Sequence, residues 1–247
     1  MKVLYIARAT LYKDPGGDTI QIVNTAMALE KLGVDVDIRL TNEHFTYGDY
    51  DLIHFFNIIR PADILAHIAK SKKPYVVSTI FVDYSEYEKT NRKGIYGLIF
   101  KVLSLDSIEY LKAIARSVVN GEAIGSKMYL FYGHRRSIRR IVKNAFALLP
   151  NSWSEYQRLS KHYNIERRCF VIPNAINPDL FQYKASPINR EANLVLCVAR
   201  IEGRKNQLNL IKALNHSKFR LVLIGSPSAN QHNYYNECKS VAGSNIE

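Results

Sequence analysis

Short apolar runs alternate with amphipathic stretches along the first 176 residues. The runs are four to seven residues long, too short for helices, and are bounded by polar residues or proline, which favours buried strands. They lie at residues 2–7, 34–40, 52–56, 75–80, 146–149 and 169–172. The pattern therefore predicts six strands.

Helical patterns occupy the spaces between several of these runs. Residues 18–32 place Ile22, Ala26 and Leu29 on one helical face, and Gly33 is placed to end the helix. Pro61 suits the first position of a helix over residues 62–70. The sequence SWSE at 152–155 has the spacing of a capping box and predicts a helix from there to about Tyr163. This alternation favours parallel crossovers in one doubly wound, Rossmann-like α/β domain.

A second, shorter α/β pattern follows a linker. Residues 177–192 are polar and contain two prolines, which is typical of an interdomain connection. Beyond them we expect a strand at 194–199, a helix at 206–216, a strand at 219–224 and a weaker helix at 234–241. The predicted organisation is an amino-terminal domain (1–176), a linker (177–192) and a partial carboxyl-terminal domain (193–247).

Composition points to a folded protein of the reducing cytosol. The 247 residues are 47% hydrophobic and 23% charged, ordinary values for a soluble globular protein. Cys169, Cys197 and Cys238 are odd in number, widely spaced and without zinc-ligand spacing. The apolar run at the amino terminus is too short for a signal peptide, and none is long enough to span a membrane. We therefore expect a cytoplasmic protein without a bound metal.

Two cations follow the strand predicted at 194–199. Arg200 ends that run, and Lys205 lies beside the start of the next helix. In open α/β sheets this edge binds phosphates, because unpaired N–H groups and the helix dipole both favour anions. The same pattern is also common on solvated turns.

Three segments in this region resemble retaining GT-B glycosyltransferases of family 4. They read VIPNAINPDLF (171–181), VARIEGRKN (198–206) and LVLIG (221–225). Relatives carry V-I-P-N-G-V-D, V-G-R-L followed by K-G, and L-V-I-V-G. Ala175, Ala199 and Asn206 depart from that pattern, but no charge is lost. The resemblance implies a GT-B fold in which Arg200 and Lys205 hold the donor diphosphate and neutralise the leaving group.

A glycine pair marks the loop after the first predicted strand. Gly16 and Gly17 would let the backbone approach a ligand closely, and Asp18 can cap the helix that follows. By resemblance, such a loop lies against the donor phosphate and the acceptor, although a plain turn explains it equally well. The spacing is not G-x-G-x-x-G, which argues against a nicotinamide site.

The end of the strand at 75–80 supplies a catalytic candidate. Many relatives have a histidine there that contacts the transferred sugar, and Asp83 is the nearest ionisable residue in this sequence. A solvated loop or a helix cap is the alternative. His54 lies within the apolar run 52–56, so we expect a hydrogen-bonded core histidine rather than a catalytic one.

The resemblance also implies a mechanism and a missing part. Retaining transfer in this family is described as a front-face displacement in which the leaving phosphate helps to deprotonate the acceptor hydroxyl. Positioning and positive charge then suffice, with a nucleotide-sugar as co-substrate and no cofactor or metal. Relatives carry an E-x7-E segment that contacts the donor, and nothing after Gly225 matches it. We therefore expect a donor-binding domain that is truncated.

Positive charge is concentrated in one segment. Of a net charge of +12, residues 92–143 contribute +8, from eleven cations and three acids. Aromatic and aliphatic residues are interleaved with them, a mixture that suits an anionic membrane surface. The candidate patch consists of Arg135, Arg136, Arg139 and Arg140. The alternative is a core face backed by solvated charges, and no nucleic-acid recognition motif is present.

Taken together, these features imply transfer of a sugar, with retention, from a nucleotide-sugar donor to a glycan or lipid-linked acceptor. The resemblance places the reaction in bacterial surface polysaccharide synthesis, with peripheral association at the inner membrane face. Two alternatives stay open. One is a GT-B sugar-nucleotide epimerase, which needs no acceptor. The other is a non-catalytic fragment that binds a membrane or an acceptor.

Overall fold

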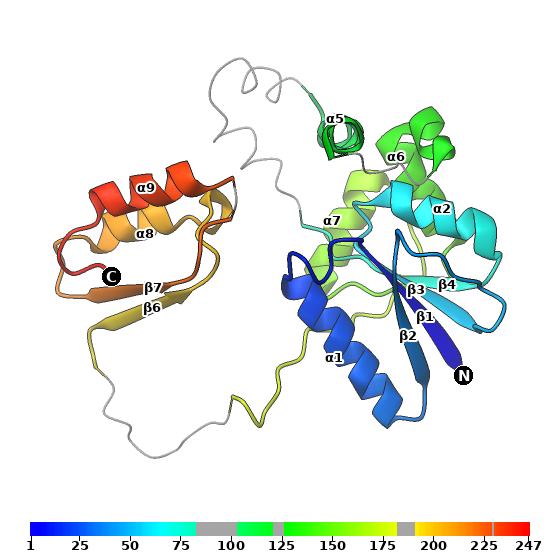
Figure 1. Ribbon diagram of the computed structural model, residues 1–247, viewed down its shortest axis with the longest axis horizontal. Helices are drawn as coiled ribbons and strands as arrows, with labels where there is room; N and C mark the ends of the chain where they lie inside the picture. The colour runs from blue at the N-terminus through cyan, green and yellow to red at the C-terminus, as the bar shows by residue number, and fades with distance from the viewer. Residues whose placement is uncertain (83–102, 121–125, 182–190, 229) are drawn as a thin grey trace. The chain divides into compact units, whose positions relative to one another are not determined.

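A computed structural model describes residues 1–82, 103–120, 126–181, 191–228 and 230–247. The chain divides into two compact units, residues 1–176 and residues 177–247 (Figure 1). We describe each unit by itself.

A five-stranded parallel sheet forms the centre of the first unit. Its strands lie in the order β2-β1-β3-β4-β5 (Figure 1). The strands are β1 (Lys2–Ala7), β2 (Asp35–Leu40), β3 (Leu52–Phe56), β4 (Tyr75–Ser78) and β5 (Ala147–Leu148). This is a doubly wound order, in which the direction of chain progression reverses between β1 and β3.

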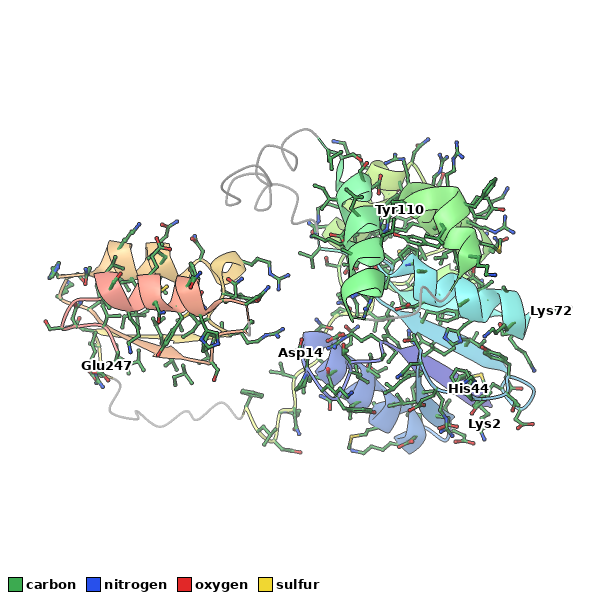
Figure 2. All side chains as sticks on the ribbon, turned by 45° about the horizontal axis from the view of Figure 1, so that its top comes forward. Lys2, Asp14, His44, Lys72, Tyr110 and Glu247 are labelled. Atoms are coloured by element: carbon green, nitrogen blue, oxygen red, sulfur yellow. The ribbon has the colours of Figure 1, made fainter. Side chains whose placement is uncertain are left out.

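Helices cover both faces of this sheet. They are α1 (Gly17–Lys31), α2 (Pro61–Ser71), α5 (Leu105–Asn120), α6 (Lys127–Asn144) and α7 (Trp153–Tyr163). Leu4 and Ile6 of β1 pack in the same buried cluster as apolar residues of α2, α6 and α7. Val3 and Tyr5 pack instead with α1. Successive strand residues point to opposite faces, so a strand buried on both faces is apolar throughout. Figure 2 shows the side chains of both layers, with Lys72 just after α2.

The strand expected at residues 169–172 is not a full strand. Cys169 forms an isolated parallel bridge with Leu148. The N–H of Phe170 donates to the Leu148 carbonyl (3.0 Å), and that of Ile172 donates to the Pro150 carbonyl (2.9 Å). The segment therefore runs along the edge of β5. Pro150 has no N–H to donate, and β5 has only two residues, so the ladder ends there.

In the described part of the basic segment, α5 and α6 are helices that the sequence analysis did not assign. The α6 helix is interrupted at Gly133, whose φ of 69° lies in the left-handed region that glycine adopts without strain. Its apolar residues divide between core and surface. Ile138 and Ile141 are fully buried, whereas Phe131 is 83% exposed. In the described part of the chain, no helix is long and apolar enough to cross a membrane.

The second unit is a small α/β layer. Strands β6 (Leu194–Val198) and β7 (Arg220–Ile224) are parallel neighbours. A 3-10 turn, η1 (Gly203–Lys205), precedes α8 (Gln207–Leu214), and α9 (His232–Val241) follows β7. Ile211, Leu221 and Cys238 form its small buried core. The carbonyl of Glu247 accepts a hydrogen bond from the Leu223 N–H (2.8 Å), so the last residues extend the ladder beside β7.

Candidate active site

The polar groups of the first unit gather at the carboxyl ends of its strands. Arg8 follows β1, Asn57 follows β3, Thr79 follows β4, and Asn151 lies three residues after β5. In sheets of this order, ligands bind at this edge, where the strand order reverses. The reversal lies between β1 and β3, so Arg8 and Asn57 flank the expected binding crevice.

Arg8 organises the glycine loop. Its Nε and Nη2 atoms donate to the two carboxylate oxygens of Asp18 at 2.6 and 3.1 Å. Nη1 donates to the Thr10 carbonyl and hydroxyl, and Nη2 also donates to the Asp14 carbonyl. Burial raises the pKa of Asp18, but the Arg8 bond and charge outweigh it and the net shift is downward. One guanidinium therefore fixes the loop that carries Gly16 and Gly17.

Asp18 is not the helix cap that the sequence suggested. Gly16 occupies the N-cap position, and its N–H donates to the Thr19 hydroxyl at 3.0 Å. Asp18 lies in the first turn, where its charge suits the positive end of the helix dipole, and its oxygens are taken by Arg8. A β-carbon on Gly17 would meet nothing within 4 Å, so the space beside this glycine is open.

The ends of β3 and β4 have unusual backbone geometry. Asn57 has φ of 68° and Ile80 has φ of 43°. Positive φ is uncommon outside glycine and especially unfavourable for β-branched isoleucine. It also explains why β4 stops at Ser78 rather than at residue 80. Within the described residues, the buried Oδ1 atom of Asn57 has no hydrogen-bond partner. Such strain and unpaired polar atoms cluster at functional sites.

A buried carboxylate joins the ends of β4 and β5. Glu155 on α7 is 5% exposed. Its Oε1 accepts hydrogen bonds from the Thr79 hydroxyl and from the Phe81 N–H (2.8 Å), on either side of Ile80. Its Oε2 accepts from the Asn151 N–H at 2.8 Å. The capping box expected at SWSE is therefore only half formed, because Ser152 receives the Glu155 N–H while the glutamate side chain points into the core.

Two further contacts complete this edge. The Gln21 side chain on α1 donates to Asn151 Oδ1 at 2.9 Å, which joins the beginnings of α1 and α7. His54 Nε2 lies 2.8 Å from the Ser78 hydroxyl, and burial lowers the pKa of His54 to about 3. The expectation of a hydrogen-bonded core histidine is confirmed.

The second unit places the predicted diphosphate-binding cations at the end of β6. Arg200 lies two residues beyond β6, Lys205 ends η1, and both are exposed. Between them, the buried Glu202 accepts from Arg204 at 3.1 Å. The Arg200 carbonyl accepts from the Gln207 side chain at 2.9 Å, which ties the loop to the start of α8.

Gly225 brings two of the family-like segments together. The Ala199 N–H donates to the Ile224 carbonyl at 3.0 Å, so VARIEGRKN and LVLIG lie side by side. A β-carbon on Gly225 would lie 1.9 Å from the Ala199 carbonyl oxygen. Only glycine allows this approach, which explains the last residue of LVLIG.

The predicted site residues are thus divided between the units, and one is not described. Gly16 and Gly17 lie in the first unit, Arg200 and Lys205 in the second, and Asp83 lies outside the described residues. Across the ranges that are described, no group of three His, Cys, Asp or Glu side chains could hold a metal ion.

Sequence reasoning missed Arg8, Asn57 and Glu155. Arg8 and Asn57 each follow a predicted strand directly, so the rule that selected Arg200 could have selected them too. Glu155 shares a helical face with Leu159 and Tyr163 at spacings of four, and a carboxylate in line with buried residues is a signal of a buried polar contact.

Comparison with solved structures identifies the fold. The match to HepE from Anabaena, in complex with UDP and glucose, covers 100% of this chain and 68% of the HepE chain, with 15% identity and a TM-score of 0.60. The match to sucrose-phosphate synthase from Thermosynechococcus elongatus covers 100% of this chain and 69% of the synthase chain, with 14% identity and a TM-score of 0.65. The match to the lipopolysaccharide outer core galactosyltransferase WaaB covers 100% of this chain and 67% of the WaaB chain, with 11% identity and a TM-score of 0.53.

These neighbours are GT-B glycosyltransferases, and the chain has a Rossmann-like α/β fold of the GT-B type. No protein-family model matches the sequence, and no curated protein matches it.

Proposed function

We propose that the protein is a glycosyltransferase that uses a nucleotide-sugar donor. The observation that carries this proposal is the arrangement at the end of β6. Arg200, Lys205 and the close Ala199–Gly225 approach occur together in a chain with a GT-B fold. HepE is described with UDP, and also with UDP-glucose. A uridine diphosphate sugar is therefore the first donor to test.

In this proposal, Arg200 and Lys205 bind the donor diphosphate. The phosphate gains negative charge as the sugar leaves, and cations placed in advance lower the energy of that state. The amino end of α8 adds a partial positive charge, although its Leu208 N–H is already donated to the Tyr234 hydroxyl at 2.9 Å. Transfer with retention, by front-face displacement, needs no further protein nucleophile, in keeping with the resemblance to family 4.

We propose that the edge of the first unit receives the acceptor. Asn57 Oδ1, which has no hydrogen-bond partner among the described residues, can accept a hydrogen bond from a sugar hydroxyl, and the open side of Gly17 leaves room for a ligand. Asp83 follows the segment that Glu155 holds, and remains the proposed catalytic carboxylate. The proposed acceptor is a glycan or a lipid-linked glycan of surface polysaccharide synthesis, met at the inner face of the membrane.

Titration of the isotope-labelled chain with UDP-glucose tests the donor site. We expect amide resonances of residues 199–206 and 225–228 to shift in NMR spectra. Arg200→Ala or Lys205→Ala should weaken binding by about tenfold or more, because each removes a charge-assisted contact with phosphate. Lys212→Ala, an exposed lysine further along α8, is the matched control and should leave the affinity unchanged.

Shifts that leave residues 199–206 unaffected, or equal affinities in all variants, would remove the diphosphate assignment. Analysis of the incubated nucleotide-sugar distinguishes the reaction classes. A transferase releases UDP only when an acceptor accepts the sugar, whereas an epimerase returns an altered nucleotide-sugar without any acceptor.

A further inference from the structure

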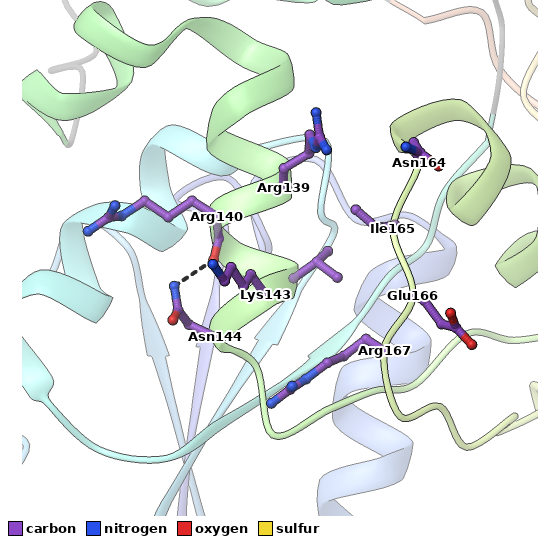
Figure 3. Close-up of a pocket in the computed structure, with 9 residues that line it drawn as sticks. Arg139, Arg140, Lys143, Asn144, Asn164, Ile165, Glu166 and Arg167 are labelled. Carbon is purple, nitrogen blue, oxygen red and sulfur yellow. Dashed lines mark hydrogen bonds between the residues drawn. The ribbon is translucent and has the colours of Figure 1, made fainter.

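A basic groove lies at the opposite edge of the first unit's sheet. Its volume is about 510 Å³, and it is formed by the last turns of α6 and the segment after α7 (Figure 3). The α6 helix is followed directly by β5, and the segment after α7 is followed by Cys169, which bridges to β5. Both therefore lie at the edge of the sheet where strands begin. The groove is therefore separate from the strand ends that carry Arg8, Asn57 and Glu155.

The groove is strongly positive. Its lining includes Arg139, Arg140, Lys143 and Arg167 against one acid, Glu166. Figure 3 shows the Glu166 carboxylate directed away from α6. The carboxyl end of α6 carries about half a negative charge, which one lysine would offset. Four cations exceed what the helix end requires.

Three of these cations form no ion pair within the described structure, although the Arg140 guanidinium lies 5.4 Å from the centre of the Tyr132 ring. Arg139, Arg140 and Lys143 are exposed, and none forms an ion pair with a carboxylate in the described ranges. Arg167 has a structural role as well, since its Nε donates to the Ala145 carbonyl at 2.6 Å. Without a carboxylate partner among the described residues, these three cations raise the electrostatic energy of the folded chain unless an anion binds them.

Arg135 differs from its neighbours on α6. It forms an ion pair with Asp106 at 3.1 Å, donates to the His162 carbonyl at 2.6 Å and lies over the Tyr163 ring. These contacts join α5, α6 and α7, so Arg135 acts in packing. Arg135 is therefore occupied within the protein, whereas Arg136 is exposed but does not line the groove.

Two exposed aromatic rings lie close in sequence to residues of the groove lining. Phe146 follows Ala145, and Phe170 lies three residues after Arg167; the two rings are 55% and 45% exposed. The Arg168 guanidinium lies 5.3 Å from one ring centre and 4.9 Å from the other. Cations beside half-exposed rings suit a bilayer interface, where rings enter the head-group layer and cations meet phosphates. Because Arg168 lies over both rings, stacking of nucleic-acid bases is less favoured.

We infer that this groove, with Phe146 and Phe170, docks the protein on an anionic phospholipid bilayer. Arg139 and Arg140 leave α6 in different directions (Figure 3), which suits several head groups better than one small anion. The charge and exposure of the groove support this docking, which does not depend on the proposed acceptor. Docking through this edge leaves the proposed acceptor residues, at the other end of the strands, uncovered by the bilayer contact.

Flotation with vesicles tests the docking surface. We expect the chain to bind phosphatidylcholine vesicles only when phosphatidylglycerol is included, and to dissociate at high salt. The triple variant with Arg139→Gln, Arg140→Gln and Lys143→Gln should bind vesicles about 100-fold more weakly. Each cation contributes about 1 kcal/mol at an anionic surface, and about 1.4 kcal/mol corresponds to a tenfold change in affinity. A matched variant, Lys31→Gln, Lys212→Gln and Lys218→Gln, loses the same charge elsewhere and should bind within a few-fold of the wild type.

The conservative variant Arg139→Lys with Arg140→Lys keeps the charge and should retain binding, which guards against a folding defect in the glutamine variant. Equal losses in both glutamine variants, or binding that ignores phosphatidylglycerol, would overturn the inference. Displacement by soluble glycerol phosphate would point instead to a small phosphate ligand and also overturn it. Binding of an oligonucleotide through these cations, without vesicle binding, would make nucleic acid the partner. Vesicle binding needs no nucleotide-sugar, so the result is independent of the donor titration.

Discussion

At the scale of single residues, the space around Gly17 and Gly225 decides whether each position can accept a side chain. Gly225 is needed because the Ala199 carbonyl oxygen occupies the position of a side chain. Gly17 has open space beside it and is the first residue of α1. The same substitution should therefore have opposite effects at the two positions.

We expect Gly225→Ala to destabilise the second unit by about 3 kcal/mol, because β6 and β7 must separate to admit the methyl group. Gly17→Ala should stabilise the first unit by about 0.5 kcal/mol, since alanine loses less backbone freedom on folding. Amide hydrogen exchange in β7 and in α1 measures each unit separately. Unchanged exchange in β7 of Gly225→Ala would contradict the close approach.

At the scale of elements, Glu155 connects α7 to the ends of β4 and β5. Three donors converge on one carboxylate, and two of them flank the strained Ile80. The carboxylate thereby fixes the backbone that leads to Asp83. This arrangement is a contact between parts of the chain 76 residues apart.

Glu155→Ala should lower the free energy of unfolding of the first unit by about 3 kcal/mol, because buried donors lose their acceptor. Glu155→Gln keeps one acceptor oxygen for Thr79 and Phe81, so its cost should be less than half as large. Urea unfolding followed by fluorescence of Trp153, the single tryptophan of the chain, reports on this unit. Equal costs for the two variants would show that packing, and not the carboxylate contacts, is lost.

At the scale of the whole molecule, two of the buried histidines of the first unit, His54 and His67, stay neutral. Burial lowers the pKa of His54 to about 3 and, with the charge of Lys70, that of His67 to about 4. In the unfolded chain each histidine takes up a proton near pH 6.5. Below that pH the unfolded state binds more protons, so the folded state loses stability as the pH falls.

The loss should begin near pH 6.5 and amount to about 1.4 kcal/mol per pH unit for each histidine until its folded pKa is reached. His67→Phe removes one titrating group and can still stack on Phe45, which His67 contacts at 5.5 Å between ring centres. We expect its unfolding free energy, measured between pH 7 and pH 5, to depend on pH less steeply by about one proton. An unchanged slope would contradict the neutral, buried state of His67.

Local patterns were sufficient for many of the elements, although not for α5 and α6. The strands β1 to β4 and the helices α1, α2 and α7 lie within a few residues of their predicted positions, because burial on both faces of a sheet leaves a run of apolar residues. The Ser152 cap could also be predicted from sequence, because it depends on residues only three positions apart. The family-like segments at 198–206 and 221–225 also lie next to each other, as a parallel pair requires.

Contacts between distant residues were decided by the tertiary structure alone. The sequence could not reveal that Asp18 pairs with Arg8 instead of capping α1, or that Glu155 turns into the core. It also could not separate Arg135, which joins three helices, from the cations of the groove. A residue's type and spacing set the secondary structure it can join. Which polar group meets which partner, and whether water is excluded there, depends on how the elements pack.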